Sequence, residues 1–188
     1  MPLDHTYLLG PWDQPSGPFS GPLYRLGLIM DAVRIAKVGV GIAQGAVDDF
    51  IELATTKTPA YTASLTADRA TVQERVARAQ ALVQAGRSSI RTTVADGWAE
   101  VQDGSRITGE RCIPMGLAAA FALDAAVQAV DLLYQSGGTT AFRDESSLQR
   151  RFRDIQTLRQ NAITSWSRYE SLGKMMLGRP SDWPFHQL

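Results

Sequence analysis

Cysteine and histidine are almost absent from this chain of 188 residues. The one cysteine, Cys112, excludes a disulfide within the chain, so we expect a reducing, cytoplasmic setting. The two histidines, His5 and His186, lie near opposite ends of the chain. A histidine-based metal site or catalytic relay in the folded middle is therefore nearly excluded, and we expect no bound metal.

The chain also lacks an excess of charge of one sign and a long hydrophobic run. Its 19 basic and 19 acidic residues give a formal net charge of zero, which is not typical of a general nucleic-acid binder. The strongly apolar stretches 38–47 and 112–123 are shorter than the roughly 20 residues that a bilayer requires. Residues 1–22 lack the basic and apolar regions of a secretory signal. We therefore expect neither a nucleic-acid partner nor a membrane partner.

Proline is nearly absent from the middle of the chain. Five of the nine prolines lie in residues 1–22 and two lie in 180–188, which leaves only Pro59 and Pro114 between. Because a helix interior rejects proline, the middle is free to be helical. Glycines and prolines separate four predicted helical runs: 23–56, 66–103, 111–136 and 146–177.

Four long helices with short joints predict an all-α fold, an up-down-up-down antiparallel four-helix bundle. The predicted organisation is a proline-rich segment over 1–22, the bundle over 23–177 and a tail over 178–188. The first and third runs are apolar around most of their circumference. Since four helices should not bury two of their number all round, the surplus apolar surface predicts a homo-oligomer or a missing domain.

Two features near the fourth run allow a structural and a functional interpretation. Gly137 and Gly138 directly follow the third run, where a helix cap is favoured over a turn that approaches a ligand. Five arginines gather around the start of the fourth run. This cluster has two interpretations. One is an ion pair between Arg150 and Asp154, which we favour from the residues alone, and the other is a binding site for an anion. The arginines are Arg143, Arg150, Arg151, Arg153 and Arg159.

Other catalytic patterns are missing. The chain has no phosphate-loop motif and no nucleophile elbow. Asp48 and Glu52 share a helix face, but a solvated face explains them better than an acid/base pair. There is no Glu-x-x-His pair, so a di-metal bundle enzyme is the least favoured hypothesis.

The stretch 131–177 nevertheless resembles a known family. It carries Gln-Ser-Gly-Gly over 135–138 and Leu-Gln-Arg-Arg-Phe-Arg-Asp over 148–154. These blocks resemble the C-terminal helical domain of the acyl-CoA dehydrogenase superfamily, particularly its branch of flavin-dependent monooxygenases. Residues 39–46 are similar to the first long helix of that domain. Residues 2–24 are similar to the segment that joins it to the family's β-domain.

The resemblance implies a four-helix bundle that forms dimers or tetramers. It also implies a flavin, FAD or FMN, between the helical domain and a β-domain, with its adenosine-diphosphate end reaching a neighbouring subunit. Gln135, Gly137 and Gly138 would line that end, and Arg150 and Arg153 would be phosphate partners or a structural ion pair. A partner that carries the β-domain would be needed if the domains are encoded separately.

The chain also departs from the family. The position of the dehydrogenases' catalytic glutamate matches Ala162, and Gln156 and Asn161 stand where the monooxygenases often have histidine. The catalytic residues are therefore unknown. The first hypothesis is a flavin-contacting, oligomerising domain of an oxidoreductase, inactive without the missing domains. The alternative is a cofactor-free structural or assembly bundle.

Overall fold

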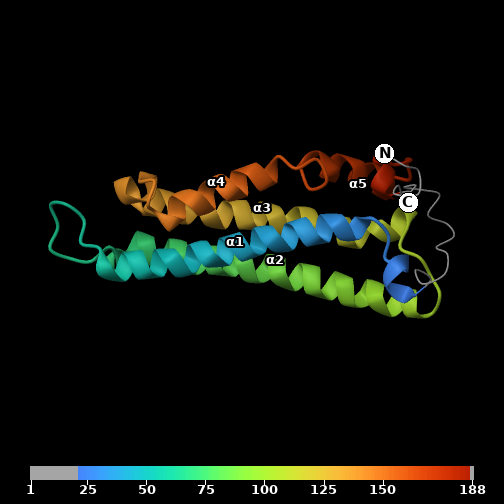
Figure 1. Ribbon diagram of the computed structural model, residues 1–188, viewed down its shortest axis with the longest axis horizontal. Helices are drawn as coiled ribbons and strands as arrows, with labels where there is room; N and C mark the ends of the chain where they lie inside the picture. Colours follow the sequence, from blue (N-terminus) through green and yellow to red (C-terminus); the bar gives the residue numbers. More distant parts are fainter. Residues whose placement is uncertain (1–20, 187–188) are drawn as a thin grey trace, which may run out of the picture.

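The computed structural model describes residues 21–186, and every regular element among them is helical. Five α-helices form the body of the protein (Figure 1). They are α1 (Ile29–Thr56), α2 (Ala70–Gln102), α3 (Ile113–Ser136), α4 (Ser147–Arg159) and α5 (Ser167–Met176). Successive rods run in opposite directions, and α4 and α5 together form the fourth rod (Figure 1). The predicted all-α bundle is confirmed.

The helix boundaries differ from the predicted runs at three places. The first run begins as a short 3-10 helix, Pro22–Arg25, and α1 starts only after Gly27, whose φ is 70°. The second run likewise opens with a 3-10 turn, Thr66–Asp68, before α2. Pro114 falls in the first turn of α3, where its missing N–H is no loss.

The larger correction concerns the fourth run, which is not one helix over 146–177. α4 ends at Arg159 and α5 begins at Ser167. Within the break, the Asn161 side-chain Oδ1 accepts a hydrogen bond of 2.9 Å from the backbone N–H of Ile163. A short polar side chain that binds nearby backbone competes with the helical hydrogen-bond pattern. The break therefore has a local cause at Asn161.

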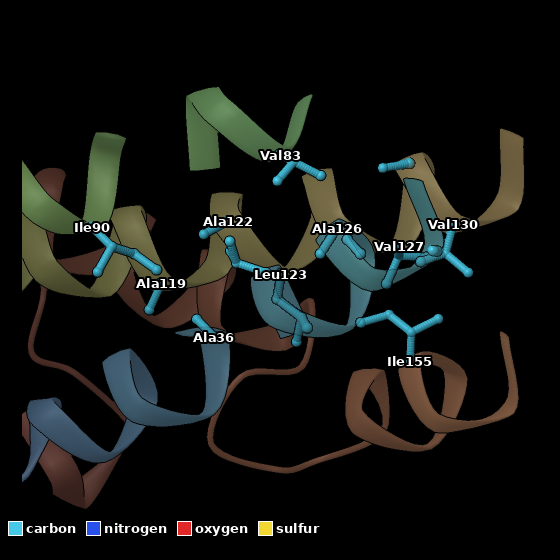
Figure 2. Close-up of a cluster of buried hydrophobic side chains, with 14 of the residues drawn as sticks. Ala36, Val83, Ile90, Ala119, Ala122, Leu123, Ala126, Val127, Val130 and Ile155 are labelled. Carbon is cyan, nitrogen blue, oxygen red and sulfur yellow. The ribbon is translucent and has the colours of Figure 1, made fainter. Parts of the chain in front are cut away.

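α3 lies at the centre of the bundle and contacts all four other α-helices. Its buried side chains are mostly alanine, which lets neighbouring backbones approach closely (Figure 2). A Cβ added at Gly86 of α2 would lie 3.1 Å from the Cα of Ala122. Leu123, Val127 and Ile155 fill the wider space between α3 and the fourth rod (Figure 2).

This packing corrects the expectation that a single four-helix chain cannot bury its two most apolar helices. The chain itself buries α3 on nearly all sides, because α1, α2 and the fourth rod surround it. α1 keeps a smaller apolar exposure, with Val38 55% and Ile51 44% accessible, and Phe121 of α3 is 41% accessible. The predicted homo-oligomer remains a prediction.

The central helix is the one described segment long and apolar enough to cross a membrane. The stretch Gly109–Ser136 has a mean hydropathy of 1.6 in its most apolar window, of which 67% is buried inside the bundle. Burial of most of this stretch inside the bundle is typical of a core helix.

The described part of the C-terminal tail docks on the bundle. The guanidinium of Arg168 on α5 lies 3.8 Å from the centre of the Trp183 ring, which stacks on Phe185. His186 is 2% exposed, and its carbonyl accepts a contact from the Cys112 thiol. By contrast, Trp98 and Trp166 are 39% and 64% exposed, so they are not core residues of this chain.

Candidate functional site

The predicted glycine pair ends α3 at the far end of the bundle from the tail. The N–H of Gly137 donates to the carbonyls of Leu133 and Tyr134, which closes the last turn. Gly138 follows with a φ of 58°, a left-handed conformation that other residues adopt only with strain. The predicted cap is therefore confirmed. The adjacent Gln135 is exposed and makes no recorded contact with the bundle.

Cationic side chains from three other segments gather around this cap. Lys57 Nζ donates a hydrogen bond of 2.8 Å to the carbonyl of Gly137. Arg75 Nη1 donates one of 3.1 Å to Ser136 Oγ. Desolvation, and then the charges of Arg143 and Arg69, lower the pKa of Lys57 from its ordinary value. The shift shows that three cations are close enough to repel one another.

We call Lys57, Arg69, Arg75 and Arg143 the cationic cluster. Repelling cations at the end of a helix bundle raise the local positive potential, which favours an anionic ligand. The two positive groups nearest the cap are also held in place by hydrogen bonds to α3.

Arg150 and Arg153 lie on the exposed side of α4 and do not join the cap through any recorded hydrogen bond. The favoured ion pair between Arg150 and Asp154 is not formed in the structure. Their neighbour Arg151 instead pairs with Asp49 of α1 at 3.2 Å. Its guanidinium lies against Gly45, where an added Cβ would be 2.7 Å from Cζ. One of the five predicted arginines thus ties α4 to α1.

A groove of about 720 Å³ lies between the end of α1 and the start of α4. Its charged lining is Arg143 against Asp49, Glu52 and Glu145. Three carboxylates facing one guanidinium make the groove a poor place for a phosphate. The other side of the cap, where the charge of Arg143 acts on Lys57, suits a phosphate better.

The two positions that match family histidines both have structural partners here. Gln156 Nε2 donates a hydrogen bond of 3.0 Å to Oδ1 of Asp131 on α3, and burial raises the pKa of that carboxyl. Asn161 holds the break between α4 and α5 through the N–H of Ile163. The structure does not bring Gln156 and Asn161 together by a recorded contact. An amide cannot act as a general base in either place.

Within residues 21–186, no three histidine, cysteine, aspartate or glutamate side chains are placed so that they could hold a metal ion together. Burial raises the pKa of the Cys112 thiol to about 12, so this cysteine is not a nucleophile at neutral pH. The described residues therefore supply positioning and positive charge rather than a metal ligand set or a reactive thiol.

The fold defines the class of this protein as an antiparallel helical bundle domain with a glycine-capped, cationic end. The family model described as "Acyl-CoA dehydrogenase, C-terminal domain" matches residues 33–166, which is more than half of the chain. The chain therefore belongs to the acyl-CoA dehydrogenase family through this C-terminal domain.

The relatives found by sequence include indole-3-acetate monooxygenases. The chain is 26% identical over 159 residues to indole-3-acetate monooxygenase from Pseudomonas putida, covering 84% of this chain and 41% of the relative. The fold is shared with XiaF from Streptomyces sp. in complex with FADH2 and glycerol, with a TM-score of 0.80 and 21% identity. It is also shared with 3-HSA hydroxylase from Rhodococcus sp. RHA1, with a TM-score of 0.77 and 24% identity.

Each of those two structures matches 88% of this chain, which covers 42% of theirs. The chain thus spans about two fifths of the length of the relatives it matches. The flavin in the Streptomyces structure belongs to that protein.

Proposed function

We propose that this chain is the flavin-contacting and oligomerising domain of a flavin-dependent monooxygenase-like oxidoreductase of the cytoplasm. It becomes active when an N-terminal helical domain and a β-domain complete the crevice, in the same polypeptide or in a partner. The observation that carries the proposal is the cationic cluster around the Gly137–Gly138 cap, in a chain that belongs to a flavoenzyme family.

The cofactor that suits this end of the bundle is FAD. Gly138 adds no side chain beside Lys57, since an added Cβ would lie 3.8 Å from Nζ. Bare backbone and fixed ammonium and guanidinium groups are what a diphosphate needs. Bound FAD supplies the redox chemistry of the reaction. Here Lys57 and Arg143 would hold the diphosphate, while Gln135, Gly137 and Gly138 would contact the adenosine side.

Arg150 and Arg153 remain candidate phosphate partners that compete with the cationic cluster. Both side chains are exposed, so neither is fixed in advance for a ligand. Lys57 is half-buried and already oriented by Gly137. A preoriented group loses less conformational entropy on binding, which favours the cluster over the α4 arginines.

The test supplies the missing domains. A chimera would join the N-terminal three fifths of the Pseudomonas putida relative to this chain, and retained flavin would be read from its visible absorbance. We expect the chimera to be yellow, and we expect free ADP to compete with FAD for binding to it. Well-folded, helical but colourless chimera that takes up no added FAD would overturn the proposal in favour of a cofactor-free assembly bundle.

Two pairs of variants assign the phosphate partners. We expect Lys57→Met and Arg143→Met each to weaken FAD binding by roughly tenfold, because each removes a charged hydrogen-bond donor. Arg150→Met and Arg153→Met serve as matched controls on the neighbouring helix and should change binding less than threefold. The reverse order of effects would move the diphosphate to α4.

A further inference from the structure

A small, partly enclosed cavity lies under the break between α4 and α5, at the opposite end of the bundle from the cationic cluster. Its volume is about 10 Å³. Ile163 and Thr164 of the break, Arg168 of α5 and the tail residues Trp183 and His186 line it. Residues of α1 and α3 form the remaining walls. Five parts of the chain therefore meet around this space: α1, α3, the break, α5 and the tail.

Two polar side chains of this lining have hydrogen-bonding atoms without a partner in residues 21–186. The hydroxyl Oγ1 of Thr164 is fully enclosed, and the residue is only 4% exposed. Arg168 Nε and Nη1 are equally enclosed and also lack an acceptor, although Nη2 donates to Ser167 Oγ at 3.0 Å. Buried polar atoms are seldom left without a partner, because each one costs free energy.

The charges around the cavity are balanced. Arg168 forms no ion pair within 4 Å among the described residues, but the carboxylates of Asp182 and Glu170 are near enough to act on its pKa. Asp182 also pairs with Lys174. An additional anion would therefore gain little here. A neutral occupant that accepts from the guanidinium and donates to the threonine hydroxyl fits the chemistry better.

We propose that this cavity is a binding site for one structural water molecule, held by Thr164 and Arg168 and closed over by the tail. Its volume matches the smallest space that admits a single water. That water accepts from Arg168 and donates to Thr164 Oγ1, and so connects the break to the tail. The inference is independent of the flavin, because none of its residues belongs to the cationic cluster.

The test uses the sign of a stability change. Thr164→Val keeps the shape of the side chain and removes its hydroxyl. If a water binds Thr164, the variant loses a hydrogen bond, and the melting temperature falls by about 2–4 °C. If the hydroxyl has no partner, its removal relieves a buried unpaired group, and the melting temperature stays the same or rises. The second result overturns the proposal.

Thr66→Val is the matched control. Thr66 is also 4% exposed, and its Oγ1 donates to the Lys57 carbonyl at 3.1 Å. The control therefore calibrates the loss of one buried hydroxyl with a known partner. We expect Thr66→Val and Thr164→Val to lower the melting temperature by similar amounts.

Two further measurements identify the occupant. We expect the effect of Thr164→Val to be equal in sodium chloride and sodium gluconate at the same ionic strength, because water is present in both. An effect confined to chloride would replace water by a halide and overturn the assignment. A crystal structure should show a water within hydrogen-bond distance of Thr164 Oγ1 and Arg168, and a dry cavity there would refute it.

Discussion

Two regions of the bundle differ in how they pack. One is the seam, which is the contact between α2 and α3, and the other is the fourth rod. The seam is a close contact of glycine and alanine, in which Gly86 lies against the backbone of Ala122. The fourth rod is divided at residues 160–166, and it adds polar links, such as Arg151 to Asp49 and Gln156 to Asp131, to its apolar contacts. A seam without spare volume fixes the register of the bundle, whereas a divided rod with polar attachments can adjust to what binds there.

The largest expected effect comes from an apolar side chain of α3 that packs against α1. Leu123 of α3 is 1% exposed, and its Cδ1 lies 2.7 Å from where a Cβ on Gly39 would be. Leu123→Ala should lower the free energy of unfolding by about 2–5 kcal/mol, measured by urea denaturation. Leu158→Ala, at a half-buried position on α4, is the control and should cost less than half as much. Equal losses would mean that the two regions are equally rigid.

The second prediction tests the seam itself. Gly86→Leu forces a side chain against the Ala122 backbone and should lower the free energy of unfolding by about 1–3 kcal/mol. Gly41→Leu on α1 is the matched control, because no atom lies within 4 Å of an added Cβ there. The control should stabilise the protein by about 0.5 kcal/mol, since leucine favours a helix more than glycine does. A tolerated Gly86→Leu would show that α2 can move away from α3.

The third prediction concerns the tail that covers the fourth rod. Burial, and then the charge of Arg168, lower the pKa of His186 from its ordinary 6.5, against the opposing effect of Asp182. The unfolded chain therefore binds a proton more readily than the folded one below about pH 6.5. Stability should fall as the pH drops through this value, by at most about 1.4 kcal/mol per pH unit for one proton.

The measurement is urea denaturation between about pH 5 and 8, where histidine is the side chain that titrates in its ordinary state. His186→Gln should remove this part of the pH dependence. His5 is present in both proteins, so its titration cancels in the difference. Identical pH profiles would show that the tail does not hold His186 in its neutral form.

The smallest expected effect is that of the ion pair between α4 and α1. Arg151 and Asp49 are 37% and 23% exposed, so water and salt screen their attraction. A double-mutant cycle with Arg151→Met and Asp49→Asn should give a coupling below about 1 kcal/mol that shrinks in high salt. Arg150→Met should show no coupling to Asp49. A coupling of several kcal/mol would show that the fourth rod is held rigidly after all.

The sequence predicted the seam half of the molecule better than the fourth rod. Proline placement predicted the rods and their antiparallel order, because a helix interior excludes proline whatever the rest of the chain does. The break at 160–166 was missed, since it depends on one side-chain hydrogen bond of Asn161 within an otherwise helical pattern. The burial of α3 within a single chain was also missed, because it depends on how closely alanine lets helices approach.

The sequence predicts the part of the site that neighbouring residues form, but not the part that the fold assembles from distant positions. The glycine cap follows from two adjacent residues. The cationic cluster comes from positions 57, 69, 75 and 143, which only the fold brings together, and no spacing in the sequence links them. The one available signal was the position of Lys57, Arg69 and Arg75 around the predicted turn between the first two helices.

The even number of rods has a geometric consequence for any longer protein that contains this bundle. The start of α1 and the segment after α5 lie at one end of the bundle, and the end of α1 lies at the other (Figure 1). α1 has 28 residues, which corresponds to about 42 Å, and Lys57 follows its last residue. A preceding domain of the same polypeptide would thus be tethered far from Lys57.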